Sequence, residues 1–407
     1  MPGLLPQNSI LKKTIIFRIL VKVYDAYQLW ELYKKYARQI KLIDKDVYHF
    51  FIFPFYHTGG AEKVHADIVN ANSSKKQIVF FTGNSYNDQN KQLFIQNATC
   101  IELFPLLRNN YYKKKILAII IEKLNKTGNN IVFSSHSKEF YSEIVPEIYK
   151  KNKCIDLIHS FVHEGEPGAE YWSMPVIDKL NKRVVIGNEI KNMLLKQYRL
   201  NNIPWELSDR IEVIHNYVDI SNNICPDDKD LNRLNVIYVG RISAEKRVEE
   251  IIEIANRITR KNNICFYFIG PGMEQLTKST LSTNIHFVGN LAKRELDSYY
   301  ELAHIIMLLS SREGIPIVLM EAMAMGVVPV TTNVGGIPEL VEHDKTGLLI
   351  ENDSDKEIRV NTAVENILLL NNNRPKLHQI GMNAYTHLKN NFSKDLFNIK
   401  YKNLLKK

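Results

Sequence analysis

From Asp46 onward, the hydrophobic positions of the chain form short runs that alternate with longer polar or helical stretches. Runs that are apolar at nearly every position are typical of strands buried on both faces of a parallel sheet. The stretches between them are long enough for the helices that connect parallel strands. In the first half of the chain the predicted strands are Tyr48–Phe53, Gln77–Phe81, Thr99–Leu103, Ile131–Ser134, Cys154–His159, Arg183–Ile186 and Ile211–Ile214.

The second half repeats this alternation after a polar stretch from Asn216 to Asn232. The tandem pattern predicts an α/β fold with two Rossmann-like domains, each built on an open parallel sheet. Ligands of such sheets bind beyond the carboxyl ends of the strands, so motifs that follow a strand are candidate site residues. The predicted strands of this half are Asn235–Val239, Cys265–Ile269, Ile285–Val288, Ile305–Leu309, Val328–Thr331 and Gly347–Ile350.

The first 45 residues differ from both halves, because they mix aliphatic and aromatic residues with many basic ones. The basic residues of this segment are Lys12, Lys13, Arg18, Lys22, Lys34, Lys35, Arg38 and Lys41. The mixture predicts a basic amphipathic helix that either packs on the protein's own body or lies on an anionic membrane surface. The predicted divisions are a helical extension at 1–45, Rossmann-like domains at 46–215 and 216–385, and a C-terminal helix at 386–407 that packs back on the N-terminal domain.

Composition limits the kinds of binding partner and the cellular compartment that we expect for this protein. With 407 residues, 45% of them hydrophobic, the chain can build two cores, and its net charge of +9 suits nucleic acid, a phospholipid surface or a phosphate-bearing substrate. The four cysteines form no CxxC pair, so neither a disulfide framework nor a structural zinc site is predicted. The sequence has no run of about 18 uncharged apolar residues and no signal-peptide pattern. We therefore expect a cytoplasmic protein, soluble or peripheral on the inner face of the plasma membrane.

The segment Ser310–Gly326 carries the most chemistry. A predicted strand leads through a glycine and a proline into an apolar helix that a second glycine closes. The start of such a helix suits a diphosphate, because free backbone amides and the helix dipole favour an anion there. Burying the ionised Glu321 carboxylate within this apolar helix costs free energy unless the carboxylate is hydrogen-bonded. The two hydroxyls of a ribose could donate those hydrogen bonds. The residues predicted at the helix start are Gly314, Ile315, Pro316 and Ile317.

This segment resembles the two-glutamate signature of glycosyltransferase family 4, and the resemblance covers roughly residues 210–350 well. It is carried by Glu313 and Glu321 with Gly314, Pro316, Ala322 and Gly326, by Val328-Pro329-Val330 and Gly335-Gly336-Ile337-Pro338-Glu339 with Gly347, and by Tyr238-Val239-Gly240-Arg241 with Lys246. The resemblance implies the GT-B fold, in which two Rossmann-like domains face each other across a cleft. The C-terminal domain would hold the donor nucleotide, and the N-terminal domain would lie on the acceptor side.

The resemblance also implies a role for each matching residue. Arg241 and Lys246, both catalytic and donor-binding, would stabilise the leaving diphosphate. Glu313 would position the sugar and Glu321 the ribose. Arg247, beside Lys246, is interpreted as lying outside the site. Further donor-binding residues are predicted in glycine-containing turns after strands, namely Gly59, Gly60, Gly270 and Gly272, and at Val288 in a neighbouring strand.

Family members carry a catalytic histidine after a central N-terminal strand, and this chain offers two candidates, His159 and His163. His136 and Glu164 are predicted on the acceptor side. A metal site at the His159 and His163 pair is not predicted, because His159 ends a strand and no third ligand is apparent in the sequence.

We therefore expect a retaining, metal-independent glycosyltransferase. It would move a sugar from a nucleotide diphosphate sugar, with UDP favoured over GDP, to a hydroxyl of a glycan or lipid-linked acceptor in bacterial cell-envelope polysaccharide synthesis. The nucleotide sugar is the co-substrate, and no other cofactor is expected. Two alternatives share the fold: a sugar-nucleotide epimerase, with Glu164 and Glu166 as acid and base, and a non-catalytic partner subunit. Nucleic acid is not an expected partner, because the sequence has no recognisable binding module.

Overall fold

The structure is a computed structural model that describes residues 7–43, 49–57, 59–72, 76–161, 168–220, 229, 232–258, 263–276 and 283–406, with side chains from residue 20 onward. The chain divides into two compact units. The N-terminal unit comprises residues 1–184, 202–212 and 401–407, and the C-terminal unit comprises 185–201 and 213–400. None of the described helices is long and apolar enough to cross a membrane.

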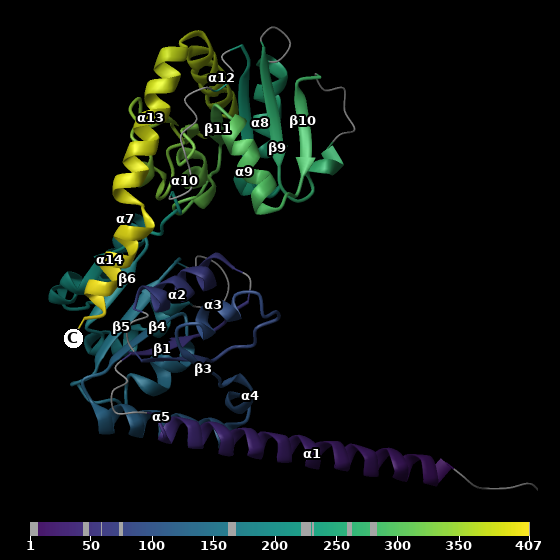
Figure 1. Ribbon diagram of the computed structural model, residues 1–407, viewed down its shortest axis with the longest axis vertical. Coiled ribbons are helices and arrows are strands. Elements are labelled where there is room, and N and C mark those ends of the chain that lie inside the picture. Colours follow the sequence, from purple (N-terminus) through teal and green to yellow (C-terminus); the bar gives the residue numbers. More distant parts are fainter. Residues whose placement is uncertain are drawn as a thin grey trace, which may run out of the picture. The chain divides into compact units, whose positions relative to one another are not determined.

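The N-terminal unit is built on a seven-stranded sheet in the order β3-β2-β1-β4-β5-β6-β7 (Figure 1). Its strands are β1 (His49–Phe53), β2 (Gln77–Phe81), β3 (Thr99–Glu102), β4 (Ile131–Ser135), β5 (Lys153–Ile158), β6 (Lys182–Val185) and β7 (Ile211–Val213). β1 pairs in parallel with both β2 and β4. Each strand coincides with a predicted one. Strands such as β1 and β2, which are buried at every position, leave a continuous apolar run in the sequence.

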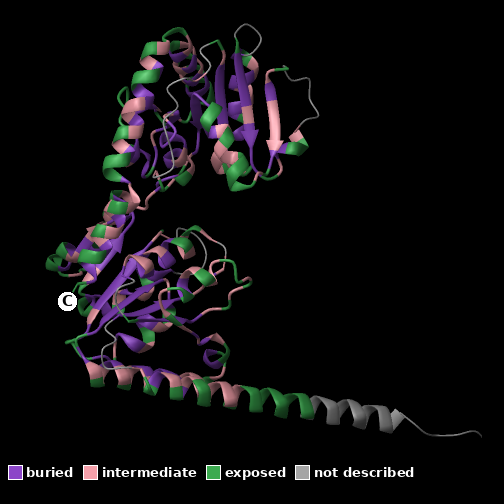
Figure 2. Ribbon diagram, in the orientation of Figure 1, coloured by how far each residue is buried: buried purple, intermediate pink, exposed green. Residues whose placement is uncertain are grey.

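Most helices of this unit cover the sheet, and one long helix precedes the first strand. They are α1 (Gln7–Lys41), α2 (Gly60–Ala71), α3 (Lys91–Ile95), α4 (Phe104–Leu107), α5 (Asn110–Thr127) and α6 (Ala169–Trp172), with short 3-10 or π turns at Phe140–Ile144, Met174–Lys179 and Trp205–Arg210. The predicted N-terminal helical extension is α1, which packs on α4 and α5. The sheet itself is almost entirely buried (Figure 2), with the rings of Phe51, Phe53 and Phe133 meeting at centroid distances of 5.9 to 6.1 Å.

The C-terminal unit contains a six-stranded sheet in the order β10-β9-β8-β11-β12-β13. Its strands are β8 (Leu234–Val239), β9 (Ile264–Ile269), β10 (Ile285–Gly289), β11 (Ile305–Leu308), β12 (Val328–Thr332) and β13 (Leu348–Ile350), and they pair in parallel. Its helices are α7 (Asn188–Leu200), α8 (Val248–Ile258), α9 (Lys293–Leu302), α10 (Ile317–Met323), α11 (Ile337–Leu340), α12 (Lys356–Asn372) and α13 (Arg374–Asn391), with 3-10 turns at Ala244–Lys246 and Met273–Leu276. Helix α14 (Lys394–Leu404) begins in this unit and ends in the N-terminal unit, which includes residues 401–407. The two predicted Rossmann-like sheets are therefore confirmed.

Each sheet has a point at which the strand order reverses. In the N-terminal unit the chain builds β1, β2 and β3 toward one edge and then returns to place β4 on the other side of β1. In the C-terminal unit it builds β8, β9 and β10 toward one edge and then places β11 beside β8. The loops after the two central strands diverge at such a reversal and open a crevice at the carboxyl end of the sheet. The reversals lie between β1 and β4 and between β8 and β11.

Helix α7 belongs to the C-terminal unit because Glu339 holds its first turn. The helix starts after Gly187, which has no side chain to cap it. One oxygen of Glu339 accepts the backbone amide of Asn188 at 2.7 Å, and the other accepts that of Glu189 at 3.1 Å. His215 also lies 3.0 Å from this carboxylate. Burial alone would raise the pKa of Glu339, but these hydrogen bonds outweigh burial and lower it.

A buried ion pair ties β5 to β6 inside the N-terminal unit. Arg183 and Asp156 are 1% and 0% exposed, and their charged groups meet at 2.8 and 3.2 Å. The Ser173 hydroxyl accepts a further bond from Arg183 at 2.8 Å, and the Tyr141 hydroxyl donates to Asp156 at 3.2 Å. Removing one member of such a pair leaves the other as an uncompensated buried charge.

We expect Arg183→Met to lower the free energy of unfolding by about 3–5 kcal/mol, because Asp156 loses its counter-charge in a buried site. Adding Asp156→Asn should restore part of the loss. The measurement is urea unfolding followed by tryptophan fluorescence. Lys345→Met is the control, since Lys345 and Glu342 form an exposed pair, and it should cost less than about 1 kcal/mol. Equal losses for the buried and the exposed substitution would contradict the account.

Candidate functional site

The Glu313 carboxylate is the centre of a polar cluster at the reversal between β8 and β11. The loop after β11 carries Ser310 and Glu313, and the 3-10 turn after β8 carries Lys246. Lys246 Nζ lies 2.5 Å from Glu313 Oε1, and the Ser310 hydroxyl donates to the same oxygen at 2.6 Å. The Lys246 and Glu313 side chains are 19% and 10% exposed. The structure thus joins two predicted site residues where the sheet favours a ligand, and it adds Ser310, which sequence reasoning missed.

Arg241 lies just after β8 and reaches toward solvent. Its guanidinium pairs with Glu245 at 2.7 Å, and the Arg241 side chain is 68% exposed. The hydroxyl of Tyr238, a buried residue of β8, donates to the Arg241 carbonyl at 2.8 Å and so fixes the backbone at this point. An exposed ion pair contributes little to stability. Arg241 can therefore turn toward an anion without cost to the fold.

Two consecutive glycines after β12 hold the backbone of the loop that carries Glu313. Gly335 has a φ of +56°, and a Cβ there would lie 1.8 Å from the Glu313 carbonyl oxygen. A Cβ at Gly336 would lie 2.9 Å from the carbonyl oxygen of Gly314. Only glycine allows this approach of two backbones. Sequence reasoning quoted the Gly-Gly pair as part of the family motif but did not place it in the site.

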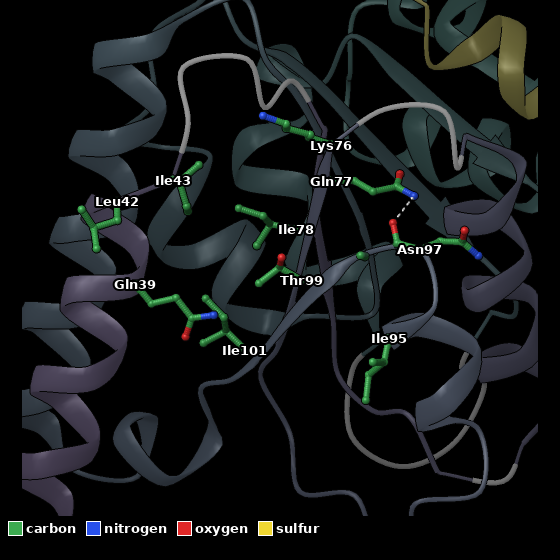
Figure 3. A pocket seen from close by; sticks show the side chains of 11 residues that line it. Gln39, Leu42, Ile43, Lys76, Gln77, Ile78, Ile95, Asn97, Thr99 and Ile101 are labelled. Atoms are coloured by element: carbon green, nitrogen blue, oxygen red, sulfur yellow. Dashed lines mark hydrogen bonds between the residues drawn. The ribbon is translucent and has the colours of Figure 1, made fainter.

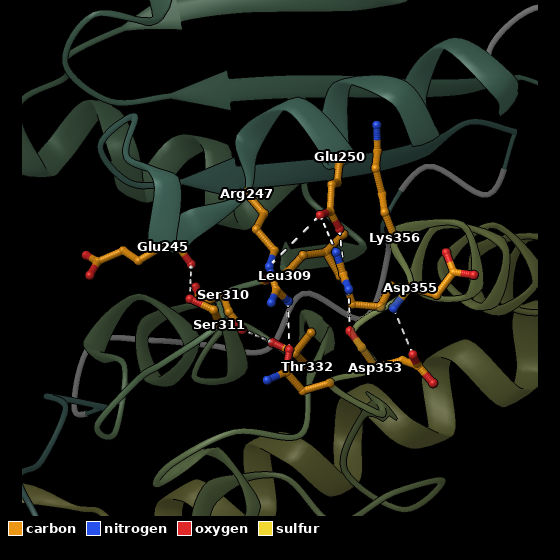
Figure 4. Close-up of polar contacts among 12 residues, drawn as sticks. Glu245, Arg247, Glu250, Leu309, Ser310, Ser311, Thr332, Asp353, Asp355 and Lys356 are labelled. Atoms are coloured by element: carbon orange, nitrogen blue, oxygen red, sulfur yellow. Dashed lines mark hydrogen bonds and ion pairs between the residues drawn. The ribbon is translucent and has the colours of Figure 1, made fainter.

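Arg247 anchors the same loop from the β8 side (Figure 4). Its backbone is left-handed, with a φ of +48°. Its Nη1 donates to the Leu309 carbonyl at 3.4 Å and to Asn352 Oδ1 at 2.7 Å, and its Nε lies 4.0 Å from Glu250. Because Leu309 begins the loop that leads to Glu313, these contacts fix where that loop starts. Arg247, interpreted from the sequence as outside the site, is part of the scaffold that holds it.

The predicted apolar helix after this loop is α10, and it is only seven residues long. Pro316 is its N-cap residue, in extended conformation. Ile315 is buried, whereas Ile317 is 42% exposed. Gly326, with a φ of +66°, follows the helix as a closing glycine should. A helix of two turns has a weak dipole, so the charge of an anion beside Gly314 would be met chiefly by side-chain cations.

Glu321 projects from α10 and finds its partners on α9. The Tyr300 hydroxyl donates to Glu321 Oε2 at 3.0 Å, and Lys293 Nζ lies 2.9 Å from Oε1. Burial and the nearby Glu321 charge raise the pKa of Tyr300. Tyr300 and Lys293 therefore already hydrogen-bond the Glu321 carboxylate, for which the sequence analysis had predicted a ribose as the partner. The bond from Glu321 to a ribose stays a prediction, and it would have to form beside these partners or replace them.

Three glycines end adjacent strands of the second sheet: Gly240 after β8, Gly270 after β9 and Gly289 in β10. A Cβ at Gly270, whose φ is +144°, would lie 1.9 Å from the Gly240 carbonyl oxygen. The Gly270 amide donates to the Gly289 carbonyl at 2.8 Å. Gly272, with a φ of +85°, lies in the turn after β9, and Val288 lies in β10 next to Gly289. Because neighbouring protein atoms take the space that a Cβ would occupy at Gly240, Gly270 and Gly289, these glycines serve the close packing of the strand ends, and a contact with the donor stays a prediction.

Three histidines meet at the carboxyl end of the first sheet. His136 follows β4, His159 follows β5 and His65 lies in α2. His159 Nε2 lies 3.0 Å from His65 Nε2, and the His136 and His159 rings are 5.9 Å apart. Burial lowers the pKa of His159 to about 3 and of His136 to about 4, and it lowers that of His65 well below its ordinary value. All three are therefore neutral near pH 7. His65 stacks on Phe53 at 4.3 Å, and no sequence motif had marked it.

The remaining predicted positions also belong to the N-terminal unit. Gly59 and Gly60 lie at the start of α2, directly after β1, and a Cβ at Gly59 would lie 1.9 Å from a carboxylate oxygen of Glu62. His163 and Glu164 lie outside the described residues. Within the described part of the chain, no group of three or more His, Cys, Asp and Glu side chains could hold a metal ion.

A cavity of about 630 Å³ lies at the other end of the first sheet, between the amino ends of β2 and β3 and the end of α1 (Figure 3). It is lined by Gln39, Leu42, Ile43, Lys76, Gln77, Ile78, Ile95, Asn97, Ala98, Thr99 and Ile101. The Gln77 amide donates to the Asn97 carbonyl at 3.0 Å on its wall. The lining is mostly aliphatic and amide, and it includes none of the predicted site residues.

Gly335→Ala should destabilise the C-terminal unit, because the new Cβ would collide with the Glu313 carbonyl and the residue would keep a positive φ. We expect a loss of about 1–3 kcal/mol in the free energy of unfolding, measured by urea titration. Gly314→Ala is the matched control, since a Cβ at Gly314 would meet nothing within 4 Å. It should change stability by less than about 0.5 kcal/mol. A harmless Gly335→Ala would disprove the close approach.

Acid should weaken the N-terminal unit through its histidine cluster. In the unfolded chain histidine titrates near about 6.5, above the folded-state pKa values of about 3 and about 4 for His159 and His136. As the pH falls, protons therefore bind to the unfolded chain before they bind to the folded one. The neutral histidines contribute fully to the free energy of unfolding above about pH 6.5, and this contribution is lost as the pH falls toward about 4. We expect the thermal midpoint to drop across this window and His136→Gln to flatten the drop. His378→Gln, at an exposed position of α13, should leave the profile unchanged, and a matching effect there would count against the cluster.

Comparisons with known proteins match the part of the C-terminal unit that contains the two-glutamate motif. The family model described as glycosyl transferases group 1 matches residues 222–387. N-acetyl-alpha-D-glucosaminyl L-malate synthase of Bacillus anthracis is 33% identical over 120 residues, 28% of this chain and 32% of that protein. The putative colanic acid biosynthesis glycosyltransferase WcaL of Escherichia coli is 33% identical over 136 residues, 30% of this chain and 33% of WcaL. These matches span about a third of each relative.

A solved structure matches both units. HepE of Anabaena, crystallised with UDP, has a TM-score of 0.67 and 16% identity, with 88% of this chain and 99% of HepE covered. The predicted GT-B fold is thereby confirmed. The match to the group 1 glycosyl transferases covers residues 222–387, and these residues include the two-glutamate motif at the strand reversal.

Proposed function

We propose that the protein is a retaining glycosyltransferase that moves a sugar from a nucleoside diphosphate sugar to a hydroxyl of a glycan or lipid-linked acceptor. The observation that carries this proposal is the Lys246, Glu313 and Ser310 cluster at the strand reversal of the C-terminal unit. Ligands of open parallel sheets bind at such reversals. The cluster also pairs a cation, which suits a phosphate, with a carboxylate, which suits sugar hydroxyls.

Lys246 and Arg241 are the cations available to a diphosphate in this arrangement. The Lys246 ammonium is engaged by Glu313 at 2.5 Å, and the Arg241 guanidinium by Glu245 at 2.7 Å. A diphosphate carries more charge than either carboxylate and would draw both cations to itself. The negative charge that builds on the departing nucleotide would then be stabilised by fixed groups, which is the main way in which an active site accelerates such a step.

The chemical step exchanges one bond at the anomeric carbon for another. The bond from this carbon to the diphosphate oxygen breaks, and the acceptor hydroxyl oxygen forms a new bond on the same face. The acceptor proton passes to the departing phosphate oxygen, so that no separate base is required. Cations supplied by side chains take the place of a metal in this scheme. Glu313, freed from Lys246, would accept hydrogen bonds from the sugar hydroxyls and hold the ring in place.

His159 fits a positioning role in the N-terminal unit better than that of a base. Burial lowers its pKa to about 3, so near neutral pH it is uncharged and binds a proton only weakly. Its contact with His65 Nε2 requires one of the two rings to donate and the other to accept, which fixes the orientation of the imidazole. A neutral, oriented imidazole can donate or accept a hydrogen bond with a sugar or acceptor hydroxyl.

Two relatives support the finer parts of the proposal. HepE was crystallised with UDP, which favours UDP over GDP as the donor nucleotide of this chain. WcaL is named for colanic acid biosynthesis, which favours an envelope polysaccharide or its lipid-linked precursor as the acceptor.

The proposal predicts that UDP protects the chain against thermal unfolding, that EDTA does not remove the protection, and that GDP and ADP protect less. A ligand at about 100 times its Kd stabilises a protein by about 2.7 kcal/mol, a shift that a thermal melt resolves. Lys246→Met should weaken UDP binding about tenfold or more, because a charge-assisted contact is lost. Lys345→Met, an exposed residue paired with Glu342, is the control and should bind UDP as wild type does.

Glu321→Ala and Glu313→Gln separate the two carboxylates in the same assay. Glu321→Ala should lose UDP protection if Glu321 binds the ribose. Glu313→Gln should keep UDP protection and lose hydrolysis of the UDP-sugar. The anomer released by slow hydrolysis, read by NMR, tests retention directly. No protection by any nucleotide would overturn the proposal and favour a non-catalytic partner subunit.

A further inference from the structure

Helix α1 is apolar on two different faces along its length. From Leu29 to its end, one face packs on α4 and α5, with Ala37 and Ile40 buried and the Tyr33 ring 5.4 Å from that of Tyr112. In the preceding turns the side chains from Leu20 to Gln28 are all exposed (Figure 2), although aliphatic and aromatic residues are frequent there. Among the side chains that the structure describes in this helix, from Leu20 onward, the body of the protein therefore accounts only for those from Leu29 to the end.

Four of the exposed apolar side chains before Leu29 form a row, and Val21, 40% exposed, lies beside it. Leu20, Val23, Tyr24 and Tyr27 are 60%, 61%, 62% and 54% exposed. They follow one another at intervals of three, one and three residues, the spacing that places side chains on one face of a helix. At 100° per residue this row lies about 150° around the helix from Ile40, on the side away from the packed face.

Basic side chains continue the same row toward the body. Lys34, Arg38 and Lys41 follow Tyr27 at seven, eleven and fourteen residues, which returns each of them to the same face. All three are exposed, and Lys34 Nζ lies 3.8 Å above the Trp30 ring, itself 43% exposed. One face of α1 is thus apolar at its start and aromatic in the middle, and toward its end it is mainly basic, with Glu31 on the same face 3.6 Å from Lys34 Nζ.

Net charge is concentrated in the same part of the chain. Residues 1–43 contain eight basic and two acidic residues, which gives +6 of the total charge of +9. No described helix can span a bilayer, so an apolar face on α1 could enter lipid only from the side. A helix with Tyr and Trp between an apolar row and a basic row matches the boundary between acyl chains and anionic headgroups.

We propose that this face of α1, from Leu20 to Lys41, docks on the surface of an anionic lipid bilayer. The row from Leu20 to Tyr27 would enter the acyl boundary, Trp30 would lie at the headgroup level, and the three basic side chains would bind lipid phosphates. A second copy of the chain is a poorer occupant, because four side chains over about 12 Å of helix bury far less than the roughly 1,200 Å² of a stable interface. The basic half of the row would also repel its counterpart. The inference does not depend on the proposed transferase activity.

The test is co-sedimentation of the full chain with vesicles of phosphatidylcholine alone or of equal parts phosphatidylcholine and phosphatidylglycerol, without nucleotide. We expect binding to the mixed vesicles that is at least about tenfold tighter than to the neutral ones and that weakens with added salt. Val23→Glu with Tyr27→Glu should reduce binding to the mixed vesicles by about tenfold or more, since two apolar side chains leave the row.

Ala26→Glu with Gln28→Glu is the matched control. It adds the same charge in the same turns at exposed positions beside the row, and it should weaken binding by about threefold or less. Replacing Lys34, Arg38 and Lys41 by Gln should abolish the preference for anionic vesicles. Failure of the wild type to bind mixed vesicles, or equal losses in the two glutamate pairs, would overturn the proposal. So would a dimer that Val23→Glu with Tyr27→Glu dissolves, because the row would then belong to a second copy.

Discussion

The contact between Lys246 and Glu313 depends on how β8 and β11 are placed. These strands are neighbours in the sheet, yet the two residues are 67 positions apart, because the chain builds β9 and β10 before it returns. The return leaves two loops side by side at the carboxyl end with no strand above them. A cation on one loop and a carboxylate on the other then meet at 2.5 Å. The same reversal that creates the crevice therefore supplies both kinds of charge that a sugar diphosphate needs.

Close backbone packing keeps this contact in place. Gly335 and Gly336 let the loop after β12 lie directly on the Glu313 and Gly314 backbone, and Arg247 holds the start of the Glu313 loop through the Leu309 carbonyl. A loop fixed from two sides can carry a nearly buried carboxylate without moving to hydrate it. Positioning of this kind requires residues that never contact the ligand, and those residues are as specific as the charged ones.

The sequence predicted every strand of the two sheets because most of them are continuous apolar runs. It predicted Lys246 and Glu313 as site residues because both follow strands and both match the family motif. It could not show which groups surround them. Glu321 pairs with the exposed Lys293 and the buried Tyr300 of α9, and no sequence motif marked these partners. The cap that Glu339 places on α7 joins residues about 150 positions apart, and such a contact leaves no periodic signal.

The N-terminal helix shows the limit of periodicity in another way. Its apolar row changes face near Leu29, so that a pattern summed over the whole helix largely cancels, and the sequence left packing and membrane docking as alternatives. The structure divides the helix between a packed half and an exposed half. The two units also differ in their chemistry. The site in the C-terminal unit contains paired charges, while burial keeps the histidines of the N-terminal unit neutral. In the proposed transfer, the paired charges would stabilise the departing diphosphate, and a neutral imidazole would hydrogen-bond a sugar or acceptor hydroxyl.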